Sequence, residues 1–436
     1  MAKARIRWRS WEPMRSEKAA RSRKPLLVLE RGLEVLESIG NRVSMAVDRE
    51  SFSSESVPAQ IASLSFLTRY SVATGEKKPM ESAIHQTHRL CHSPLYDAVE
   101  GGFFKGVTHG KIKTSKLLSH NAQWLMLVLS LRGDSEATFA LPMARGILHF
   151  LQGRLLLPGG GFGNAQGEDP AYYALSGNGR RQVEAPPVDQ TLYTASSALA
   201  LRALCEGSWV LGETEYLQMA LDTFASLESW VEDSKGALSH AHGDRPLGEG
   251  TLEDTVQMGL AYLALYRATL EPSHLEGVTR MARRVIGKYK NPAGEGFLNA
   301  QLPAKSSGRP SAPLADPAPN ARAASFLLIA SAQLGDESLS VPALGILGAL
   351  AASLPEDLES AGSLGNALLV ALLPMAVYEA VTDGSEAQRS RVLERLRQVG
   401  SSLIVITHRL PAPREGMQRL PRLIRYCGAD RHEIVI

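Results

Sequence analysis

Apolar residues recur every three to four positions along most of this chain, and this period predicts helices over most of its length. The region from about residue 58 to 399 divides into consecutive segments of this kind, separated by polar or glycine-rich stretches. The predicted helices cover residues 58–74, 79–93, 115–132, 135–152, 189–207, 212–232, 251–270, 273–290, 318–334, 336–353, 361–381 and 385–399.

The connections between these helices alternate in length. Short turns such as RGDSE, GSWVLGETE, EPS and LGDE join the first helix of a pair to the second, and longer segments join one pair to the next. Twelve helices in six hairpins is the number in an (α/α)6 toroid, so the predicted fold is mainly α with an inner and an outer ring. An irregular helical solenoid is the alternative architecture.

Composition assigns the helices to the two rings. The first helix of a pair is apolar on nearly all sides, as in TVQMGLAYLALY, whereas the second is amphipathic, as in HLEGVTRMARRVIGKYK. A helix that is apolar all round is buried. We therefore predict that residues 189–207, 251–270, 318–334 and 361–381 lie in the inner ring.

Glycine and a large apolar residue recur together in the long connections. The stretches are EGGFFKG at 100–106, PGGGFGNA at 158–165, SKGALSHAH at 234–242 and AGEGFLNA at 293–300. None has the GxxxxGK[ST] pattern of a phosphate-binding loop. Each follows an outer helix and precedes an inner one, so we expect all of them at one end of the ring. Short strands or hairpins there would bury the apolar residue and together form the mouth of a central cavity.

The two ends of the chain have a different pattern. PLLVLE at 25–30 predicts a buried strand, and SSLIVITHRL and EIVI predict two strands near the C-terminus. We therefore divide the chain into a small α/β element at 1–57, the toroid at 58–399 and a short α/β tail at 400–436.

Composition narrows the classes of function. The 436 residues carry a formal net charge of +2, so nothing in the overall charge points to nucleic acid. Three widely spaced cysteines without a CxxC pattern argue against a disulfide scaffold. The longest apolar run, GNALLVALLPMAVYEAV, is too short to span a membrane and is interpreted as a buried helix. With no signal peptide in view, we expect a cytoplasmic protein with no membrane contact, and the oligomeric state is left open.

Several segments resemble, in the same order, those of thioredoxin-domain proteins that include the spermatogenesis-associated ones. They include DRESFSSESV, FLTRYSVATGE, LYDAVEGGFF, KLLSHNA, YYALSGNGR, PPVDQTLYT, LEDTVQMGLAYLALYRAT and APNARAASFLLIASAQLGDE. The resemblance extends over nearly the whole chain. It implies a thioredoxin-like domain joined to a six-hairpin glycosidase-like toroid, with residues 1–57 as a truncated remnant of the first.

The chain departs from that family at chemically important positions. Family members have a stretch with Cys and His before the RESF segment, where this chain reads GNRVSMAVD, and without a thiolate we expect no disulfide exchange. The family pattern PHFEKMLYDNA appears as IKTSKLLSHNA, in which only Lys116 and Asn121 keep their types. Elsewhere the family pattern is kept at Asp169, Asp189, Tyr193, Glu253, Asp254 and Asn320.

Sugar-processing toroids use carboxylate pairs or histidines at the cavity mouth, and the resemblance implies the same location here. Hydrolysis needs an acid and an opposing base or nucleophile, whereas epimerisation needs groups that remove and return a proton. The candidate catalytic residues are Asp189, Asp254, Glu253 and His240, and the candidate ligand-binding residues are Glu100, Lys116, Asn121, Asp169, Tyr193 and Asn320. Asp189 and Glu253 lie at predicted helix starts, where acidic residues also serve as caps.

A separate cluster consists of His85, His88, Cys91 and His92. The three histidines share one face of a predicted helix, a spacing that can bind zinc. The helix is predicted to be an outer one, and no distant fourth ligand is apparent. We interpret the cluster as a surface face and expect neither a metal nor a cofactor.

Two functions remain open from the sequence. In the first, the toroid is a divergent binding or scaffold protein for a carbohydrate or small metabolite, without the family's redox motif and with fewer polar cavity residues. In the second, it is a sugar-active enzyme of the epimerase or glycosidase type that uses the carboxylates and histidines at the mouth. Both place the ligand at the rim formed by the long connections.

Overall fold

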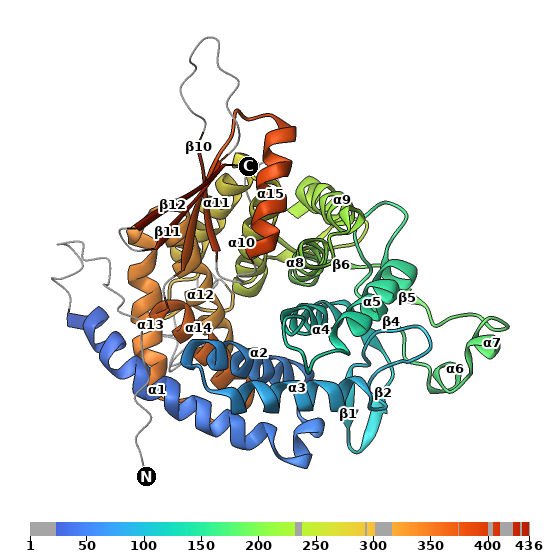
Figure 1. Ribbon diagram of the computed structural model, residues 1–436. Helices are drawn as coiled ribbons and strands as arrows, with labels where there is room; N and C mark the ends of the chain where they lie inside the picture. Colours follow the sequence, from blue (N-terminus) through green and yellow to red (C-terminus); the bar gives the residue numbers. More distant parts are fainter. Residues whose placement is uncertain are drawn as a thin grey trace.

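The computed structural model describes residues 23–231, 238–292, 294–300, 316–373, 375–399, 404–409, 422–427 and 430–435. Figure 1 shows a ring of helices with a small sheet against one side of it.

The inner ring is closed, because each of its helices packs against the next and the last packs against the first. In order around the ring these helices are α2 (Val57–Thr74), α4 (Leu118–Ser130), α8 (Thr194–Leu211), α10 (Leu252–Thr269), α12 (Pro317–Leu334) and α14 (Leu358–Leu372). The predicted (α/α)6 toroid is confirmed, and so is the inner position of the four helices α8, α10, α12 and α14.

The outer ring covers the inner one. Five outer helices each pack against the inner helix that precedes them: α3 (Lys77–Cys91), α5 (Ala140–Phe150), α9 (Thr214–Val231), α11 (Pro272–Lys288) and α13 (Ser340–Ala352). The sixth outer position is taken by α1 (Arg23–Val47), which packs against α13 and α14.

The predicted strand at 25–30 is therefore wrong, because these residues belong to α1. Further along the helix, Leu36, Ile39, Val43 and Val47 form one buried stripe at helical spacing. This stripe continues a helical pattern that the short apolar run PLLVLE does not show by itself. The structure describes no strand within residues 23–57, and the thioredoxin-like remnant and membership of that family stay predictions.

The predicted helix 361–381 is wrong in its second half. Helix α14 ends at Leu372, and Leu373 has extended dihedral angles (φ −95°, ψ 142°). A residue before proline, here Pro374, is pushed out of the helical region, so the chain leaves the helix at this point. Strand β9 (Ala376–Val381) follows.

Strand β9 belongs to a four-stranded sheet with the order β10-β9-β11-β12. Strands β10 (Ile404–Arg409) and β12 (Asp430–Val435) confirm the two predicted C-terminal strands, and β11 (Arg422–Cys427) lies antiparallel between β9 and β12. Helix α15 (Glu386–Val399), predicted as the outer partner of 361–381, packs instead against α10 and β11. The sheet-containing unit thus begins before residue 400.

A second, smaller core joins this sheet to the C-terminal ends of inner helices. Trp209, Tyr266 and Leu270, at the ends of α8 and α10, pack with Tyr378 and Ile406. At the end of α12, the Gln333 amide donates to the Ile406 carbonyl at 2.5 Å and accepts from the Ile406 amide at 3.2 Å. The sheet is therefore fixed to the short-turn end of the ring.

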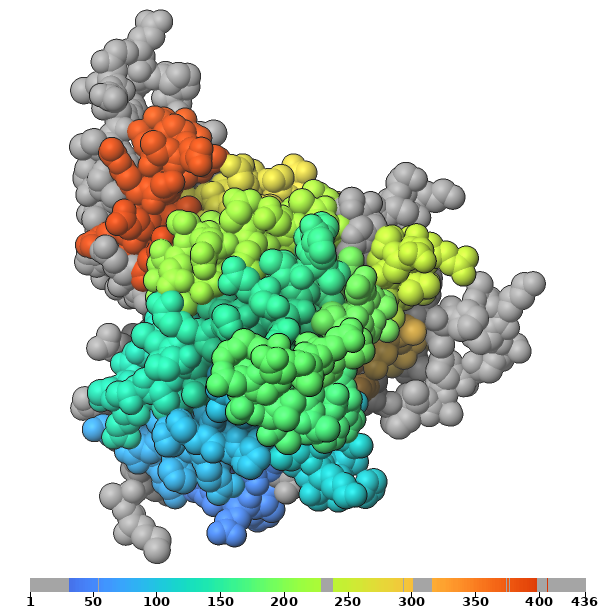
Figure 2. All heavy atoms as spheres, turned by 90° about the vertical axis from the view of Figure 1, so that its right-hand side faces the viewer, coloured from blue at the N-terminus to red at the C-terminus, as the bar shows by residue number. Residues whose placement is uncertain are grey.

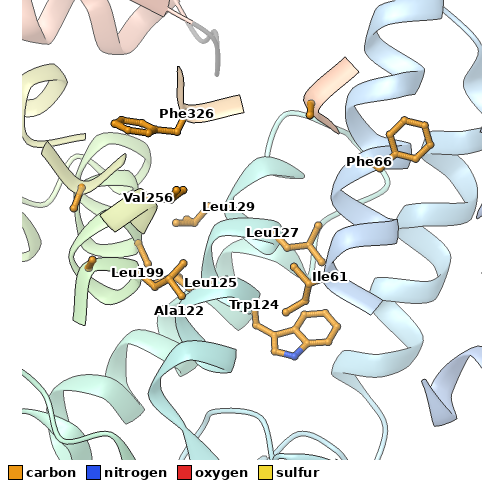
Figure 3. Close-up of a cluster of buried hydrophobic side chains, with 14 of the residues drawn as sticks. Ile61, Phe66, Ala122, Trp124, Leu125, Leu127, Leu129, Leu199, Val256 and Phe326 are labelled. Carbon is orange, nitrogen blue, oxygen red and sulfur yellow. The ribbon is translucent and has the colours of Figure 1, made fainter. Parts of the chain in front are cut away.

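The main core fills the seams between the helices. Figure 3 shows Leu125 against Leu199 where α4 meets α8, and Ile61 beside Leu127 where α2 meets α4. Burial of a side chain of this size contributes about 1.5–3 kcal/mol.

The glycine-containing connections fold as tight turns, as predicted. The bridges Tyr96↔Phe103, Leu156↔Phe162 and Lys290↔Phe297 close three of them, and their phenylalanine rings are buried. Gly101 shows why glycine is needed: its φ is +77°, and an added Cβ would lie 2.1 Å from the Gly146 carbonyl oxygen.

Small sheets link neighbouring connections side by side, so these segments form one rim. One sheet joins β3 (Lys116–Leu117), β4 (Ala165–Gln166) and β5 (Val188–Asp189), and the next joins β6 (Leu192–Tyr193), β7 (Ser239–His242) and β8 (Pro246–Glu249). A hairpin, β1 (Gly106–Thr108) and β2 (Lys111–Lys113), and two short helices, α6 (Pro170–Tyr173) and α7 (Gly177–Arg180), project from the same connections. In the side view of Figure 2, the cyan and yellow-green parts of these connections lie at the right-hand edge.

Two further properties of the described residues bear on function. None of their helices combines the length and apolar character that a membrane span requires. Cys91 and Cys205 are free and buried, and burial raises the pKa of each thiol to about 12. At neutral pH neither thiol supplies the thiolate that nucleophilic chemistry needs.

Candidate functional site

The rim brings together three of the predicted residues, His240, Asp254 and Tyr193. His240 lies on β7, and its Nδ1 is 2.8 Å from Oδ2 of Asp254 in the first turn of α10. The ring of Tyr193 meets the imidazole edge-on, with the ring centroids 5.5 Å apart. A carboxylate accepts hydrogen bonds, so this contact favours the neutral tautomer with the proton on Nδ1 and the lone pair on Nε2. The His240 side chain is 44% exposed, which leaves Nε2 accessible.

Asp254 holds this histidine because the local sequence folds as a helix cap. Thr251 and Asp254 form a capping box, in which the Thr251 hydroxyl accepts from the Asp254 amide and the Asp254 carboxylate accepts from the Thr251 amide. The other carboxylate oxygen accepts from the Ala195 amide of α8 at 3.1 Å. Asp254 is completely buried, so these contacts support a role in positioning His240, and the catalytic role predicted for it stays a prediction.

A separate polar row, here called the axial row, links side chains of the inner helices. Arg202 on α8 donates to Gln257 Oε1 at 2.6 Å, and Gln257 donates to Glu253 Oε1 at 2.7 Å. Arg322 on α12 then bridges Glu253 at 3.1 Å and Glu359 on α14 at 3.3 Å. Four consecutive inner helices thus contribute to one connected network.

The partial exposure of Glu253, Arg322 and Glu359 indicates that this part of the row faces the axis of the ring. Glu253 and Arg322 are each 30% exposed at the side chain, and Glu359 is 33% exposed. An inner helix has inner neighbours on both flanks and an outer helix behind it, so solvent reaches these side chains from the axial side. Burial by itself would lower the pKa of Arg322, but Glu253 and Glu359 outweigh it and raise the pKa above its ordinary value.

Asp189 and Asp169 lie on the same rim, beside α4. Asp189 is part of β5 and not of the α8 start, because α8 begins only at Thr194. It is exposed and accepts from the Thr191 amide at 3.1 Å and from Asn164 at 3.3 Å. Partial burial opposes these bonds but does not outweigh them, and the pKa of Asp189 is lowered. Asp169 caps α6 through the Tyr172 amide at 3.0 Å.

Lys116 and Glu100 belong to a cluster of charged side chains beneath the rim. This cluster holds the short helices α6 and α7 against the ring. The Lys116 ammonium is 0% exposed and lies 2.6 Å from Asp97, which also meets Arg180 at 2.6 Å. Glu100 binds Arg154 and accepts from the Tyr172 hydroxyl at 2.6 Å. These contacts give Lys116 and Glu100 structural partners, and the ligand-binding role predicted for them stays a prediction.

Asn121 and Asn320 make the same pair of hydrogen bonds, each to the backbone of a buried phenylalanine. The Asn121 amide accepts from the Phe103 amide at 2.6 Å and donates to the Phe103 carbonyl at 3.0 Å. Asn320 makes the same two bonds to Phe297, at 2.8 and 3.0 Å. Both asparagines are buried and hold a glycine-aromatic turn against an inner helix. Ligand binding by either stays a prediction that these contacts do not support.

The three histidines of the α3 cluster are exposed at the surface. The rings of His88 and His92 stack with centroids 4.1 Å apart, and His88 also meets Phe139 edge-on. Over the described part of the chain, no group of three or more His, Cys, Asp or Glu side chains is placed to hold a metal ion. On α4, burial lowers the pKa of His120 to about 4, so this imidazole is neutral at pH 7.

Sequence reasoning missed the residues of the axial row other than Glu253. Arg202 and Arg322 each occur as the single charge of an otherwise uncharged run, TASSALALRAL and ARAASFLLIASAQ, within a largely apolar helix. A lone arginine in such a helix is the signal that could have found them, because a buried charge needs a partner.

Comparison with known proteins gives a fold and no family. The chain matches no family model and no curated protein sequence. Among solved structures, it is similar to an α-mannanase of glycoside hydrolase family 76 from Bacteroides thetaiotaomicron, with 13% identity, a TM-score of 0.60, and coverage of 80% of this chain and 98% of that one. The fold is a six-hairpin glycosidase-like toroid. An unsaturated glucuronyl hydrolase specific for heparin is also similar, with 12% identity, a TM-score of 0.58, and coverage of 78% and 96%. At these identities the likeness shows the fold alone.

The arrangement at the rim can support two kinds of chemistry. The axial row offers paired donors and acceptors of the kind that fix the orientation of a polar ligand. The Asp254–His240 pair presents an imidazole nitrogen that can accept a proton. The candidate carboxylates are each engaged already, Asp254 and Asp169 as caps, Glu253 with Arg322, and Asp189 with Thr191 and Asn164.

Proposed function

We propose that this toroid binds a carbohydrate on the axial side of its rim. The observation that carries the proposal is the row from Arg202 through Gln257, Glu253 and Arg322 to Glu359, part of which faces the axis. A sugar presents several hydroxyl groups that both donate and accept, and a row of alternating amide, carboxylate and guanidinium groups can match them. The proteins of similar fold named above act on sugars, which agrees with this choice of ligand class.

The burial and the hydrogen bonds of the candidate carboxylates support sugar binding better than hydrolysis. Glycoside hydrolysis needs one carboxyl group as a proton donor and a second one opposite as base or nucleophile. Asp254 is buried, and Glu253 shares its oxygens with Arg322 and Gln257. Hydrogen bonds lower the pKa of Asp189, which makes it a poor proton donor at neutral pH.

The proposal predicts that neutralising the axial row weakens sugar binding. We expect Glu253→Gln or Glu359→Gln to reduce the affinity for a bound sugar about tenfold, because a charge-assisted hydrogen bond to a hydroxyl is replaced by a neutral one. A panel of D-mannose, D-glucose, D-glucuronate and D-glucose 6-phosphate is screened by thermal shift, and binding is then measured by titration calorimetry.

The matched control is Glu213→Gln in the short turn after α8, where Glu213 pairs with the exposed Arg145. This variant should bind as the wild type does. If none of these sugars binds the wild type, or if the control loses as much affinity as the axial variants, the proposal is wrong.

A second function is favoured by one specific observation, the pairing of the exposed His240 with the buried Asp254. Asp254 favours the tautomer in which Nε2 is free to accept a proton, which is what the removal of a hydrogen next to a sugar carbonyl requires. We therefore propose sugar isomerisation or epimerisation by proton transfer as the second candidate.

A further inference from the structure

Helices α4 and α12 start at the same height below the rim. Asn121 on α4 and Asn320 on α12 make the same two hydrogen bonds to the phenylalanine of the turn before their helix. Each asparagine is also the fourth residue of its helix. Residues at the same position in these two helices therefore lie at the same depth along the axis of the ring.

The sixth residues of the six inner helices form one layer of the ring. In order around it they are Ala62, Gln123, Leu199, Gln257, Arg322 and Ser363. Three of them, Leu199, Gln257 and Ser363, are buried, whereas the other three are partly exposed. Since alanine has no polar side chain, Gln123 and Arg322 are the two polar residues of this layer that solvent reaches.

Gln123 lies on the axial face of α4. The other faces of this helix are occupied, because Leu125 packs toward α8 and Leu127 toward α2 (Figure 3), and Asn121 binds the preceding turn. The remaining positions, at helical spacing, are partly exposed and carry Ser119, Gln123 and Met126. With inner helices on both flanks of α4, solvent reaches these side chains from the axis.

Gln123 and Arg322 lie on opposite walls of the ring. Helices α4 and α12 are three places apart in a closed ring of six, so they are opposite each other. Packed helices lie about 8–10 Å apart, which puts opposite helices of a hexagon about 16–20 Å apart. A helix with its side chains is about 10–12 Å wide, so about 4–10 Å remains between the two walls. A space of this width suits a single sugar ring.

The two side chains differ in what they already bind. Arg322 bridges Glu253 and Glu359. By contrast, the side chain of Gln123 makes no hydrogen bond to another residue in the described part of the chain. A side-chain amide has two N–H donors and one acceptor oxygen, so Gln123 can offer all of them to a ligand.

We propose that Gln123 is a further sugar-binding residue, and that a single sugar ring lies between Gln123 and the Glu253–Arg322–Glu359 part of the axial row. A sugar ring carries hydroxyl groups on opposite edges, and each hydroxyl both donates and accepts. The charged residues then bind one edge and the Gln123 amide binds the other. This inference rests on the proposed carbohydrate site, to which it adds a second wall and the size of the bound unit.

The test asks which hydroxyl group each wall binds. The probes are D-glucose, D-mannose and the deoxy sugars that lack the hydroxyl at C2, C3, C4 or C6, and titration calorimetry measures the affinity for each. The proteins are the wild type, Gln123→Ala, Glu359→Gln and the control Gln218→Ala. Gln218 is an exposed glutamine on the outer helix α9, where it binds Asp222 at 2.9 Å.

We expect Gln123→Ala to lower the affinity for the parent sugar about three- to tenfold, the usual effect of one hydrogen bond between neutral groups. One deoxy sugar, which lacks the hydroxyl that Gln123 binds, should bind equally to the wild type and to Gln123→Ala. A different deoxy sugar should show this behaviour with Glu359→Gln. Gln218→Ala should bind as the wild type does. Because alanine favours helix and no described hydrogen bond is lost, Gln123→Ala should melt no lower than the wild type.

The outcomes separate this inference from the proposed function. If Gln123→Ala binds as the wild type does while Glu359→Gln loses affinity, the inference is overturned and the carbohydrate site stands. The same holds if both variants depend on one and the same hydroxyl, or if Gln123→Ala loses affinity equally for every deoxy sugar. If neither D-glucose nor D-mannose nor any deoxy sugar binds the wild type, the inference is overturned together with the carbohydrate site.

Discussion

Replacing Asp97 with asparagine should lower the free energy of unfolding by about 3–5 kcal/mol, the usual cost of removing one partner from a buried charge cluster. The side chains of Lys116, Asp97 and Arg180 are 0%, 2% and 3% exposed, and one oxygen of Asp97 meets both cations at 2.6 Å. A neutral amide in place of this carboxylate would leave the buried Lys116 ammonium without its ion-pair partner, and Arg180 with Glu100 alone, at 3.4 Å. The Lys116 ammonium also lies 4.6 Å from the centre of the Phe150 ring, which offers only weak compensation.

This cluster should also make the free energy of unfolding depend on pH. Burial by itself would raise the pKa of Asp97, but the hydrogen bond from Arg180 and the charge of Lys116 outweigh it and lower the pKa. A carboxyl group whose pKa is lower in the folded state stabilises the fold above its unfolded pKa, about 3.9. That contribution is lost as the pH falls through the folded-state pKa, so acid should destabilise the wild type more steeply than Asp97→Asn.

Urea unfolding followed by circular dichroism measures both effects. The matched control is Asp48→Asn, since Asp48 pairs with Lys78 at 3.9 Å on the surface and such a pair contributes at most about 1 kcal/mol. A loss below about 1 kcal/mol for Asp97→Asn, or equal losses in the two variants, would contradict the structural role of the cluster.

For the proton-transfer function, His240→Gln should slow hydrogen exchange at the carbon next to the sugar carbonyl by about 10²–10⁴-fold, the usual contribution of a general base. The wild type is incubated with D-mannose or D-glucuronate in D2O, and loss of the proton signal is followed by NMR. Glutamine keeps a polar side chain on β7 but has no nitrogen lone pair that accepts a proton.

The control for this experiment is His88→Gln on the outer helix α3, a histidine whose ring packs against His92 and Phe139 and not against Asp254. It should exchange at the wild-type rate. Absence of exchange in the wild type would remove the enzymatic candidate and leave sugar binding alone. Equal rates in wild type and His240→Gln would show that another group takes the proton.

The ring could be predicted from the sequence because its helices carry a local signal. Helices α8, α10, α12 and α14 are apolar on nearly every side, and the glycine-aromatic turns mark the boundaries between hairpins. The strand β9 and the helix α1 could not be predicted in the same way. In both places a short apolar run fits either a helix or a strand. The end of α14 before β9 depends on Pro374, and the helical state of α1 depends on the buried stripe from Leu36 to Val47, which packs against distant helices.

The site was harder to predict because its partners are distant in sequence. His240 and Asp254 are near neighbours in the chain, and both were among the predicted residues. Asp97 and Lys116 come from one connection and Arg180 from the next, and Arg202, Glu253, Arg322 and Glu359 come from four helices. Only closure of the ring brings such residues together, so residue type alone did not separate a cap such as Asp254 from a residue that faces the axis.

Hydrogen–deuterium exchange with and without a bound sugar tests the location of the site most directly. With the tightest-binding of D-mannose, D-glucose and D-glucuronate, we expect added protection at β7 and in the N-terminal halves of α8, α10 and α12. The short turns at residues 131–139, 212–213 and 270–271 should exchange as before. Protection confined to those turns or to the sheet of β9 to β12 would contradict a carbohydrate site at the axial side of the rim.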